Sequence, residues 1–542
     1  MTASVSDAPQ TRGHLARLWA FAMSAEARPA RLGFLGAVLI AAGGLGAGST
    51  RLHDPLLESL HMSWLRFGHG LVLSSILLWG GVAVMLLAWL WLGRRVVDRT
   101  ATQYTMLATT GFWLVPLLLS APVFSRDTYS YLAQGALLRD GFDPYVVGPV
   151  ENVNSLLDNV SPIWTTTTAP YGPAFILVAK FVTMIVGNNV VGGTMLLRLC
   201  MLPGLALLIW ATPRVARHLG ANPAAALWIC VLNPLVIIHL MGGVHNEMLM
   251  VGLMMAAIAL TFGGRPILGV GFIATAVAVK ATAGIALPFM VWVWMRRLRD
   301  TRGYGPVPAF AFATAASVVI FGAVFAVLSL LAGVGLGWLT ALAGSVKIIN
   351  WLTLPTAFAN VINALVGMVM PVNFYAVLEI TRIIGIAIIA ISLPLLWWRF
   401  RHTDREALVG TTLAMGVVVL FVPAALPWYY TWPLATLSTL WQSRTAVALI
   451  AGFSTWIMVI FKPDGSHGMY SLLQVALATG CATLAWYLLS RAPEEPATPG
   501  RPRRLIANTP WPARGGGPHA PGVSAARRPA AHWPASRCCR RD

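Results

Sequence analysis

One acidic residue of the chain stands in a setting that suits acid–base chemistry. Asp127 lies in residues 124–131, directly after a long apolar segment. A carboxylate there could accept a proton from a sugar hydroxyl, with Tyr129 stacked against the sugar ring. The run also fits a helix N-cap, because Asp is favoured at that position and Ser125 competes for it. Spacing alone gives these two interpretations equal weight.

Two cations, Lys280 and Arg198, lie near the ends of apolar runs. An ionisable residue inside a membrane span is costly and marks a candidate functional site. A lone Lys or Arg near a helix end more often extends towards the headgroups. Two cations at similar depth that face an acidic loop favour an anion site, such as one for a phosphate.

A polar triplet, His245, Asn246 and Glu247, forms a short turn between two apolar runs. Metal binding is not expected, because no further ligand follows at helical spacing. We interpret the triplet as hydrogen-bonding groups for a sugar, and we group Trp428 and Tyr429, in a second turn, with it. No metal site and no cofactor is predicted, and dependence on a divalent metal stays open.

Membrane-spanning helices must position these residues. Of the 542 residues, 57% are hydrophobic and 11% are charged, less than half of the roughly 25% charged residues of soluble proteins. The net charge of +19 could suggest nucleic acid, but ten Arg against three acidic residues put much of it in residues 491–542. The composition predicts an all-α polytopic membrane protein that contacts membrane lipids and no nucleic acid.

About fourteen apolar runs approach the length needed to cross the roughly 30 Å hydrocarbon layer. They are residues 32–48, 71–92, 105–123, 191–212, 223–240, 246–262, 266–280, 282–295, 309–331, 374–398, 408–425, 431–441, 446–461 and 470–489. Loops near Arg94, Arg214, Arg297 and Arg399 are assigned to the cytoplasm by the positive-inside rule. Both termini are then inside and Asp127 is outside.

The longest polar segment before the tail, residues 124–189, is assigned to the outer face as the functional loop. Its second half, residues 171–187, is apolar enough to cross the membrane. A crossing there would move the Arg214 loop outside, so we expect an interfacial or re-entrant helix instead.

Three regions are expected along the chain. Residues 1–31 form a cytoplasmic segment without the pattern of a removable signal peptide, and residues 32–490 form the membrane domain. Residues 491–542, which have ten Pro and ten Arg and no apolar periodicity, form a disordered cytoplasmic tail.

Five stretches in order along the chain resemble one enzyme family. They are SRDTYSYLAQGALLRDGFDPY (125–145), APYGPAFILVAK (169–180), NPLVIIHLMGGVHNEMLMVGLM (233–254), AVAVKATAGIALPF (276–289) and LPWYYTWPL (426–434). Together they resemble the polyprenol-phosphate-mannose-dependent α-(1→6)-mannosyltransferases MptA and MptB. Residues 53–70 and 461–471 look closer to the elongating MptA branch.

The resemblance implies a GT-C-type glycosyltransferase fold with about 14 transmembrane helices and short extracytoplasmic helices, in the plasma membrane with the active site outside. It implies mannose transfer from polyprenyl-phosphate-mannose to a lipid-linked α-(1→6)-mannan, with inversion, in lipomannan and lipoarabinomannan synthesis. Asp127 matches the family's catalytic carboxylate and is assigned as the base. Lys280, Arg198 and Arg126 are assigned to the donor phosphate.

Two alternatives stay open at this point. An initiating enzyme of the MptB type would share every motif above. A transporter or flippase of a polyprenyl-linked glycan would use the same basic patch to hold phosphate, but such proteins commonly show related halves with broken helices, and we find no internal repeat.

Overall fold

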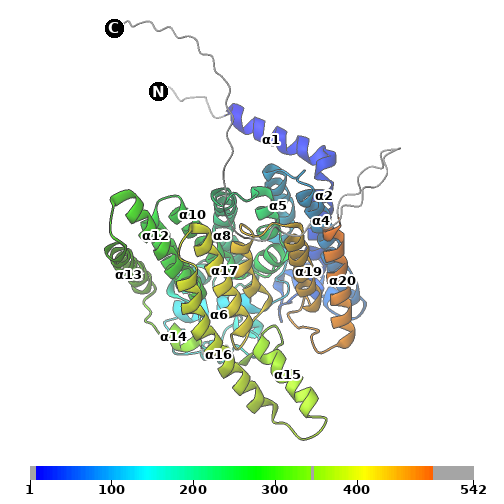
Figure 1. The fold of residues 1–542 in the computed structure, drawn as a ribbon. Helices are drawn as coiled ribbons and strands as arrows, with labels where there is room; N and C mark the ends of the chain where they lie inside the picture. Colours follow the sequence, from blue (N-terminus) through cyan, green and yellow to red (C-terminus); the bar gives the residue numbers. More distant parts are fainter. Residues whose placement is uncertain (1–7, 343–346, 492–542) are drawn as a thin grey trace, which may run out of the picture. The chain divides into compact units, whose positions relative to one another are not determined.

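The computed structural model describes residues 8–342 and 347–491, which belong to one compact unit. These residues form helices and no β-strand, with one isolated bridge between Phe461 and His467. The α-helices are α1 (Ala8–Met23), α2 (Arg28–Ala47), α3 (Pro55–Ser59), α4 (Gly68–Val97), α5 (Gln103–Leu118), α6 (Asp127–Arg139), α7 (Pro173–Val186), α8 (Val190–His218), α9 (Pro223–Cys230), α10 (Glu247–Phe262), α11 (Pro266–Val279), α12 (Ala286–Arg302), α13 (Pro306–Ala332), α14 (Trp338–Ala341), α15 (Leu354–Val366), α16 (Phe374–Arg399), α17 (Asp404–Phe421), α18 (Thr431–Leu437), α19 (Arg444–Ile460) and α20 (Leu472–Ser490) (Figure 1).

Six helices within the described residues are long and apolar enough to cross a membrane, and a bent pair brings the number to seven. The six are α2 with the short turn before it, α4, α8, α13, α16 and α20. Five further apolar helices, α7, α10, α11, α15 and α19, have 10–17 residues. At 1.5 Å per residue even 17 residues cover about 25 Å, less than the hydrocarbon layer. The protein is therefore a helical membrane protein. Of the fourteen crossings expected from the sequence, only six or seven are made by described helices that are long enough to span the membrane.

The bent pair is α9 and the π-helix η5 (Leu235–Gly242), which meet at 49°. The sequence pattern predicts one continuous span here, and the structure breaks it at Asn233-Pro234. Proline lacks an N–H and disfavours helical geometry in the residue before it. The side chain of Asn233 compensates, since its Oδ1 accepts from the backbone N–H of Leu235 at 3.0 Å and its Nδ2 donates to Ser454 Oγ at 2.9 Å.

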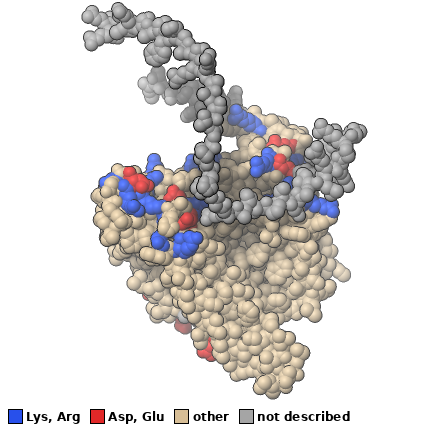
Figure 2. Space-filling view, viewed as in Figure 1, with Lys and Arg blue, Asp and Glu red and all other residues tan. Residues whose placement is uncertain are grey.

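The arginine-bearing loops lie together on one face. Arg94 Nη1 donates to the carbonyl of Arg491 at 2.7 Å, while Arg296 and His218 both contact Asp404, at 2.7 and 2.9 Å. Arg217 Nη1 donates to Gln103 at 2.9 Å. Lys and Arg side chains gather at the end where α1 lies (Figures 1 and 2). The loops that were expected on one side of the membrane thus share one face of the fold. We call this face, which carries Arg94, Arg217 and Arg296, the arginine face.

The segment between α5 and α8 contains no helix that is long enough to be a candidate span. Its second half is α7, whose 14 residues cover about 21 Å. Helix α7 packs closely on α6, because a Cβ at Gly135 would lie 2.3 Å from the carbonyl oxygen of Ala179. The interfacial or re-entrant position expected for this helix stays a prediction.

The ends of the chain differ in what the structure describes. The expected N-terminal polar segment contains a helix, α1, at Ala8–Met23. The tail expected to be disordered lies outside the described residues, except Arg491.

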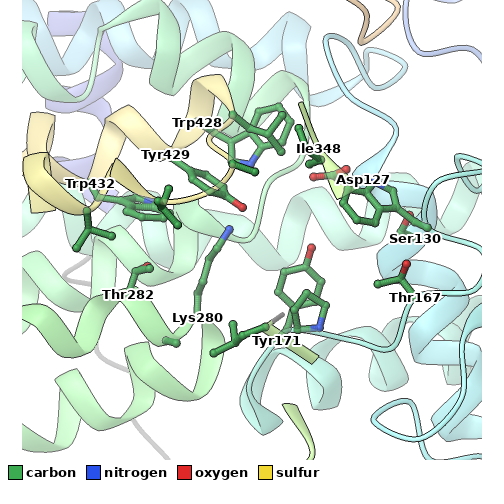
Figure 3. Close-up of a pocket in the computed structure, with 18 of the residues that line it drawn as sticks. Asp127, Ser130, Thr167, Tyr171, Lys280, Thr282, Ile348, Trp428, Tyr429 and Trp432 are labelled. Carbon is green, nitrogen blue, oxygen red and sulfur yellow. The ribbon is translucent and has the colours of Figure 1, made fainter. Parts of the chain in front are cut away.

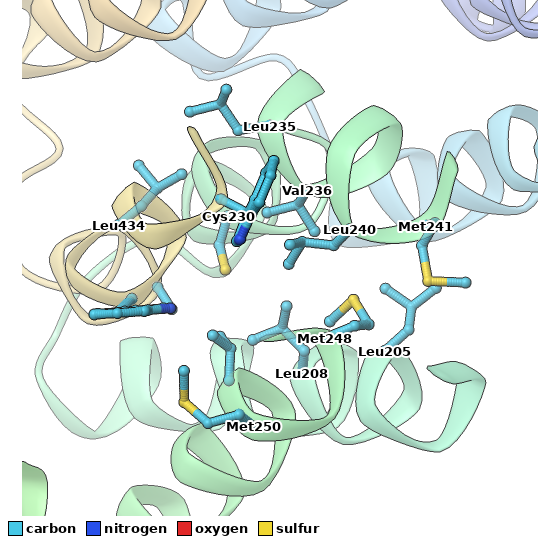
Figure 4. Packing of buried hydrophobic residues seen from close by; sticks show 14 of the residues in the cluster. Leu205, Leu208, Cys230, Leu235, Val236, Leu240, Met241, Met248, Met250 and Leu434 are labelled. Carbon is cyan, nitrogen blue, oxygen red and sulfur yellow. The ribbon is translucent and has the colours of Figure 1, made fainter. Parts of the chain in front are cut away.

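A buried apolar core supports the turn between η5 and α10. Leu205 and Leu208 of α8 face Met248 of α10 and Leu240 of η5 (Figure 4). Helices α8 and α10 approach so closely that a Cβ at Gly252 would lie 2.0 Å from a backbone oxygen of α8. Such close packing holds the polar turn that follows η5 in a fixed place.

Candidate active site

Asp127 is the first residue of α6, and its carboxylate does not cap the helix. The N-cap residue is Arg126, which makes no side-chain cap, and Ser125 Oγ accepts the backbone N–H of Asp127 at 3.1 Å. The preceding Phe124 has φ 67° and donates its N–H to the Pro463 carbonyl at 2.7 Å. The carboxylate is thus left for other contacts, and its side chain keeps 14% exposure.

A histidine from the turn after η5 stands beside this carboxylate. His245 Nδ1 lies 3.7 Å from Asp127 Oδ2 and 3.5 Å from the hydroxyl of Tyr131. The His245 ring stacks on Trp428, with centroids 3.6 Å apart and planes at 24°. His245 is fully buried and lines neither of the two cavities that Asp127 lines, so it contacts Asp127 from within the protein.

Lys280 is the C-cap of α11, where the chain turns into the 3-10 helix η6 (Ala281–Ile285). Its ammonium group pairs with the carboxylate of Glu247, the first residue of α10. Aromatic rings surround the ammonium, with centroids at 4.3 Å for Tyr429, 5.5 Å for Trp432 and 5.9 Å for Tyr171. Rings at this range stabilise a cation that has lost water.

Asp127 and Lys280 open into the same cavity, of about 280 Å³ (Figure 3). Figure 3 shows the ammonium group of Lys280 directed between the rings of Tyr429 and Tyr171, with Asp127 beyond them. The other wall is apolar and comes from residues far apart in sequence, namely Leu342, Ile348, Val418, Val422 and Leu426. The cavity therefore has a charged end and an apolar side.

A second cavity, of about 520 Å³, meets the first at Asp127. Asp127, Trp164 and Trp428 are among the residues that line both cavities, whereas Lys280 lines only the first. The remaining polar lining of the second cavity is Ser125, Arg126, Ser161, Lys347, Asn350, Asp464, Ser466 and His467. The carboxylate of Asp127 thus stands at the junction of two differently lined spaces.

Burial and a neighbouring carboxylate weaken the acidity of Asp127. Loss of water is the largest cause, the negative charge of Glu247 adds to it and the positive charge of Lys280 opposes both, and together they raise the pKa of Asp127 to about 7. A carboxyl group with this pKa can both accept and release a proton near neutral pH. Burial lowers the pKa of His245 well below its usual value, so this ring stays neutral.

The other residues singled out in the sequence take different places. Asn246 and Glu247 are fully buried and line neither cavity, and neither amide atom of Asn246 has a partner among the described residues. Tyr129 is also fully buried, with its hydroxyl donating to the Ser49 carbonyl at 2.6 Å. Arg126 lines the second cavity and donates to two backbone carbonyls.

Arg198 does not reach either cavity. Its guanidinium group is fully buried and donates to the carbonyls of Met241, Leu118, Ser120 and Gly242, at 2.7–3.2 Å. These bonds join the end of α5 to the end of η5. The expected contact with a lipid phosphate does not fit this geometry, because the donors are already used by the backbone.

Three cavity residues had no functional interpretation in the sequence. Trp164 lies in a Thr-rich loop without periodicity, Tyr171 begins the apolar segment 171–187, and Trp432 lies in the apolar run 431–441. A signal existed for Trp432, which follows Trp428 and Tyr429 at helical spacing. Within residues 8–342 and 347–491, no group of three or more His, Cys, Asp or Glu could hold a metal ion.

The fold and the site define a polytopic membrane protein with a carboxylate and a cation in one cavity. Residues 30–296 match the family "Alpha-(1->6)-mannopyranosyltransferase, N-terminal domain", and residues 355–491 match "MptB C-terminal domain". Alpha-(1->6)-mannopyranosyltransferase A of Mycobacterium tuberculosis is 72% identical over 92% of this chain and 96% of its own. Alpha-(1->6)-mannopyranosyltransferase A of Corynebacterium glutamicum is 38% identical over 82% of this chain and 94% of its own.

The chain belongs to this family and is an α-(1→6)-mannosyltransferase of the membrane. Alpha-(1->6)-mannopyranosyltransferase B of C. glutamicum is 30% identical over 85% of the chain and 82% of its own. The higher identities to the A proteins agree with the resemblance to MptA. The alternative of a transporter or flippase is overturned by this membership.

Proposed function

We propose that the protein elongates a lipid-linked α-(1→6)-mannan with mannose taken from polyprenyl-phosphate-mannose, inverting the anomeric centre. The observation that carries the proposal is the position of Asp127 at the junction of two cavities, with Lys280 in only one of them. In a single displacement the hydroxyl attacks the sugar on one face, and the phosphate departs from the opposite face. A base between two separate spaces suits that requirement.

The first cavity is assigned to the donor. Lys280 can share its ammonium between Glu247 and the donor phosphate, and the aromatic rings around it can face the mannose. The apolar wall, which includes Val418 and Val422, suits the first isoprene units of the lipid. Arg198 is reassigned from the phosphate to the scaffold.

The second cavity is assigned to the acceptor. Arg126 and Asp464 supply hydrogen-bonding groups, and Trp164 and Trp428 supply flat apolar faces towards the junction. His245, Asn246 and Glu247 are assigned as buried residues that hold the cavity side chains in place, since their own side chains are fully buried.

The reaction can be written with these roles. The acceptor's 6-hydroxyl loses its proton to Asp127 while its oxygen forms a bond to C1 of mannose. The bond from C1 to the phosphate oxygen breaks, and its electron pair leaves with the polyprenyl phosphate. Lys280 neutralises the charge that builds on this leaving group. The products are a mannan longer by one unit, polyprenyl phosphate and a protonated Asp127.

The site is proposed to face the extracytoplasmic side of the plasma membrane. The arginine face carries Arg94, near the end of the 30-residue helix α4, whose length is about 45 Å. The other end of α4 begins at Gly68, beside the loop of Asp464, which also lines the second cavity. If the arginine face is cytoplasmic, the cavities lie outside. A GT-C fold with about fourteen crossings is part of the same proposal.

The direct test is mannosyl transfer by the purified full-length protein. Polyprenyl-phosphate-mannose and α-(1→6)-mannosides of increasing length are supplied, and the product linkage and anomeric configuration are determined by NMR. We expect α-(1→6) extension from a β-linked donor, with longer mannosides preferred. Transfer from a nucleotide sugar alone, or retention of the donor's configuration, would overturn the proposal.

A further inference from the structure

A third cavity, of about 420 Å³, is lined by the end of α2, the start of α4 and the loop after α19. Arg66 and Lys462 both line it, together with Asp464. We infer that this Arg66–Lys462 cleft binds the phosphate group of a membrane lipid. The binding of a lipid phosphate does not depend on the proposed function. Only its assignment to the anchor of a lipid-linked acceptor rests on that function.

Each cation of the cleft has a donor without a partner among the described residues. Lys462 is half-buried, and its ammonium group has no hydrogen bond or ion pair in the described part of the chain. Arg66 donates through its Nη atoms to the carbonyls of Arg51 and Leu52, but its buried Nε has no partner among the described residues. A partly buried cation without a partner is costly, and an anion removes that cost.

The acidic residue in the cleft pairs with neither cation and offsets only one of the two positive charges. Asp464 is exposed, and its Oδ1 accepts from the backbone and the hydroxyl of Ser466, at 2.9 and 2.7 Å. No ion pair joins Asp464 to Lys462 or Arg66 within residues 8–342 and 347–491. The formal charge of the lining is therefore one positive unit, which suits a phosphodiester.

The apolar part of the cleft suits the chains of a lipid. Leu71, Leu78 and Trp79 of α4 line it, and both α2 and α4 are candidate spans. Phe67 and Leu71 are exposed, at 67% and 41%. Exposed apolar side chains on a spanning helix, with two cations at its end, form the pattern expected for a headgroup with its acyl chains.

The cleft also lies next to the proposed acceptor site. Asp464 lines the cleft and the second cavity, and the second cavity shares Asp127 with the first. Two sources of lipid phosphate fit this position. One is the anchor of a lipid-linked acceptor, which rests on the proposed function, and the other is an anionic phospholipid of the bilayer.

Lipid retention measured by native mass spectrometry tests the site without turnover. The full-length protein, the Lys462→Met variant and the Arg66→Met/Lys462→Met double variant are purified from nanodiscs of mixed phosphatidylglycerol and phosphatidylcholine. Removing one cation should weaken phosphatidylglycerol retention about fivefold, and the double variant should lose more. Lys462→Arg should restore most of it. Lys180→Met, which removes a half-buried lysine of α7, is the matched control.

A kinetic comparison then identifies the source. A rise in KM for a phospholipid-anchored mannoside, with KM for a soluble mannoside unchanged, assigns the phosphate to the acceptor anchor. Reduced lipid retention with both KM values unchanged assigns it to the bilayer. Equal phosphatidylglycerol retention by wild type and the double variant, with both thermally stable, would overturn the inference. So would equal preference for phosphatidylcholine.

Discussion

Lys280 carries the clearest residue-scale consequence of the site, because its charge is buried and already paired. Lys280→Ala should lower kcat/KM for the lipid donor about 10- to 100-fold, the range expected for a hydrogen bond to a charged group. Lys280→Arg should recover only part of the loss. The positive charge is kept, but a planar guanidinium fits differently among the surrounding aromatic rings. The measurement is donor kinetics in membranes matched for protein level. Wild-type donor kinetics in Lys280→Ala would leave Lys280 only a structural role as the ion-pair partner of Glu247, and Lys180→Ala serves as the control.

Glu247 links the lysine to the base through charge. Because the pKa of Asp127 is raised to about 7, the fraction of ionised base, and with it kcat, should fall about tenfold per pH unit below 7. The negative charge of Glu247 contributes to this raised pKa, so Glu247→Gln should move the acidic limb of the kcat profile to lower pH. Lys280 also loses its partner, and kcat at the optimum should fall.

A pH series of kcat for wild type, Glu247→Gln and Asp140→Asn checks this coupling. Asp140 pairs with Arg139 at 2.7 Å on the far end of α6, so its replacement should leave the profile in place. An acidic limb that does not move in Glu247→Gln would contradict electrostatic coupling between Glu247 and Asp127.

At the scale of elements, Arg198 joins α8 to the ends of α5 and η5. Arg198→Leu leaves four buried carbonyls without their donor, and the unfolding free energy should fall by about 3 kcal/mol or more. Thermal unfolding in detergent measures the loss. The donor KM of the fraction that folds should stay near the wild-type value. A stable Arg198→Leu protein with a raised donor KM would restore the phosphate role expected from its sequence.

The sequence shows why Arg198 is difficult to assign. An apolar run reveals that a helix exists, but a single cation in it does not reveal which neighbours its side chain meets. Here those neighbours are carbonyls at the end of η5 and at the end of α5. The break itself has a local signal in Pro234. Trp164 offers no such signal, because its place at the cavity depends on the folding of an irregular loop.

Other site residues could be predicted because local composition limits their surroundings. Charged or polar residues are rare in this chain, so Asp127, Lys280, Trp428 and Tyr429 stand out from apolar surroundings, and the structure gathers them around one cavity. The number of crossings is harder to predict, since apolar runs of 10–17 residues serve equally as spans and as buried or interfacial helices.

For the whole molecule, the arginine face and the cavities should lie on opposite sides of the membrane. Val153, which is 85% exposed in the loop between α6 and α7, and exposed Arg214 provide positions for single cysteines. In a background without the five native cysteines, Val153→Cys should react with an impermeant thiol reagent in intact cells. Arg214→Cys should react only after permeabilisation. Labelling of Arg214→Cys from outside would reverse the orientation.

The role of Asp127 as the base is the central claim, and Asp127→Asn tests it most directly. The substitution keeps the shape of the side chain and a hydrogen-bond acceptor but cannot take a proton. Mannosyl transfer is measured in membranes matched for protein level, with Asp140→Asn as the control. The account predicts a fall in turnover of about 100-fold or more in Asp127→Asn and little change in the control. An Asp127→Asn enzyme that retains wild-type turnover would contradict the account.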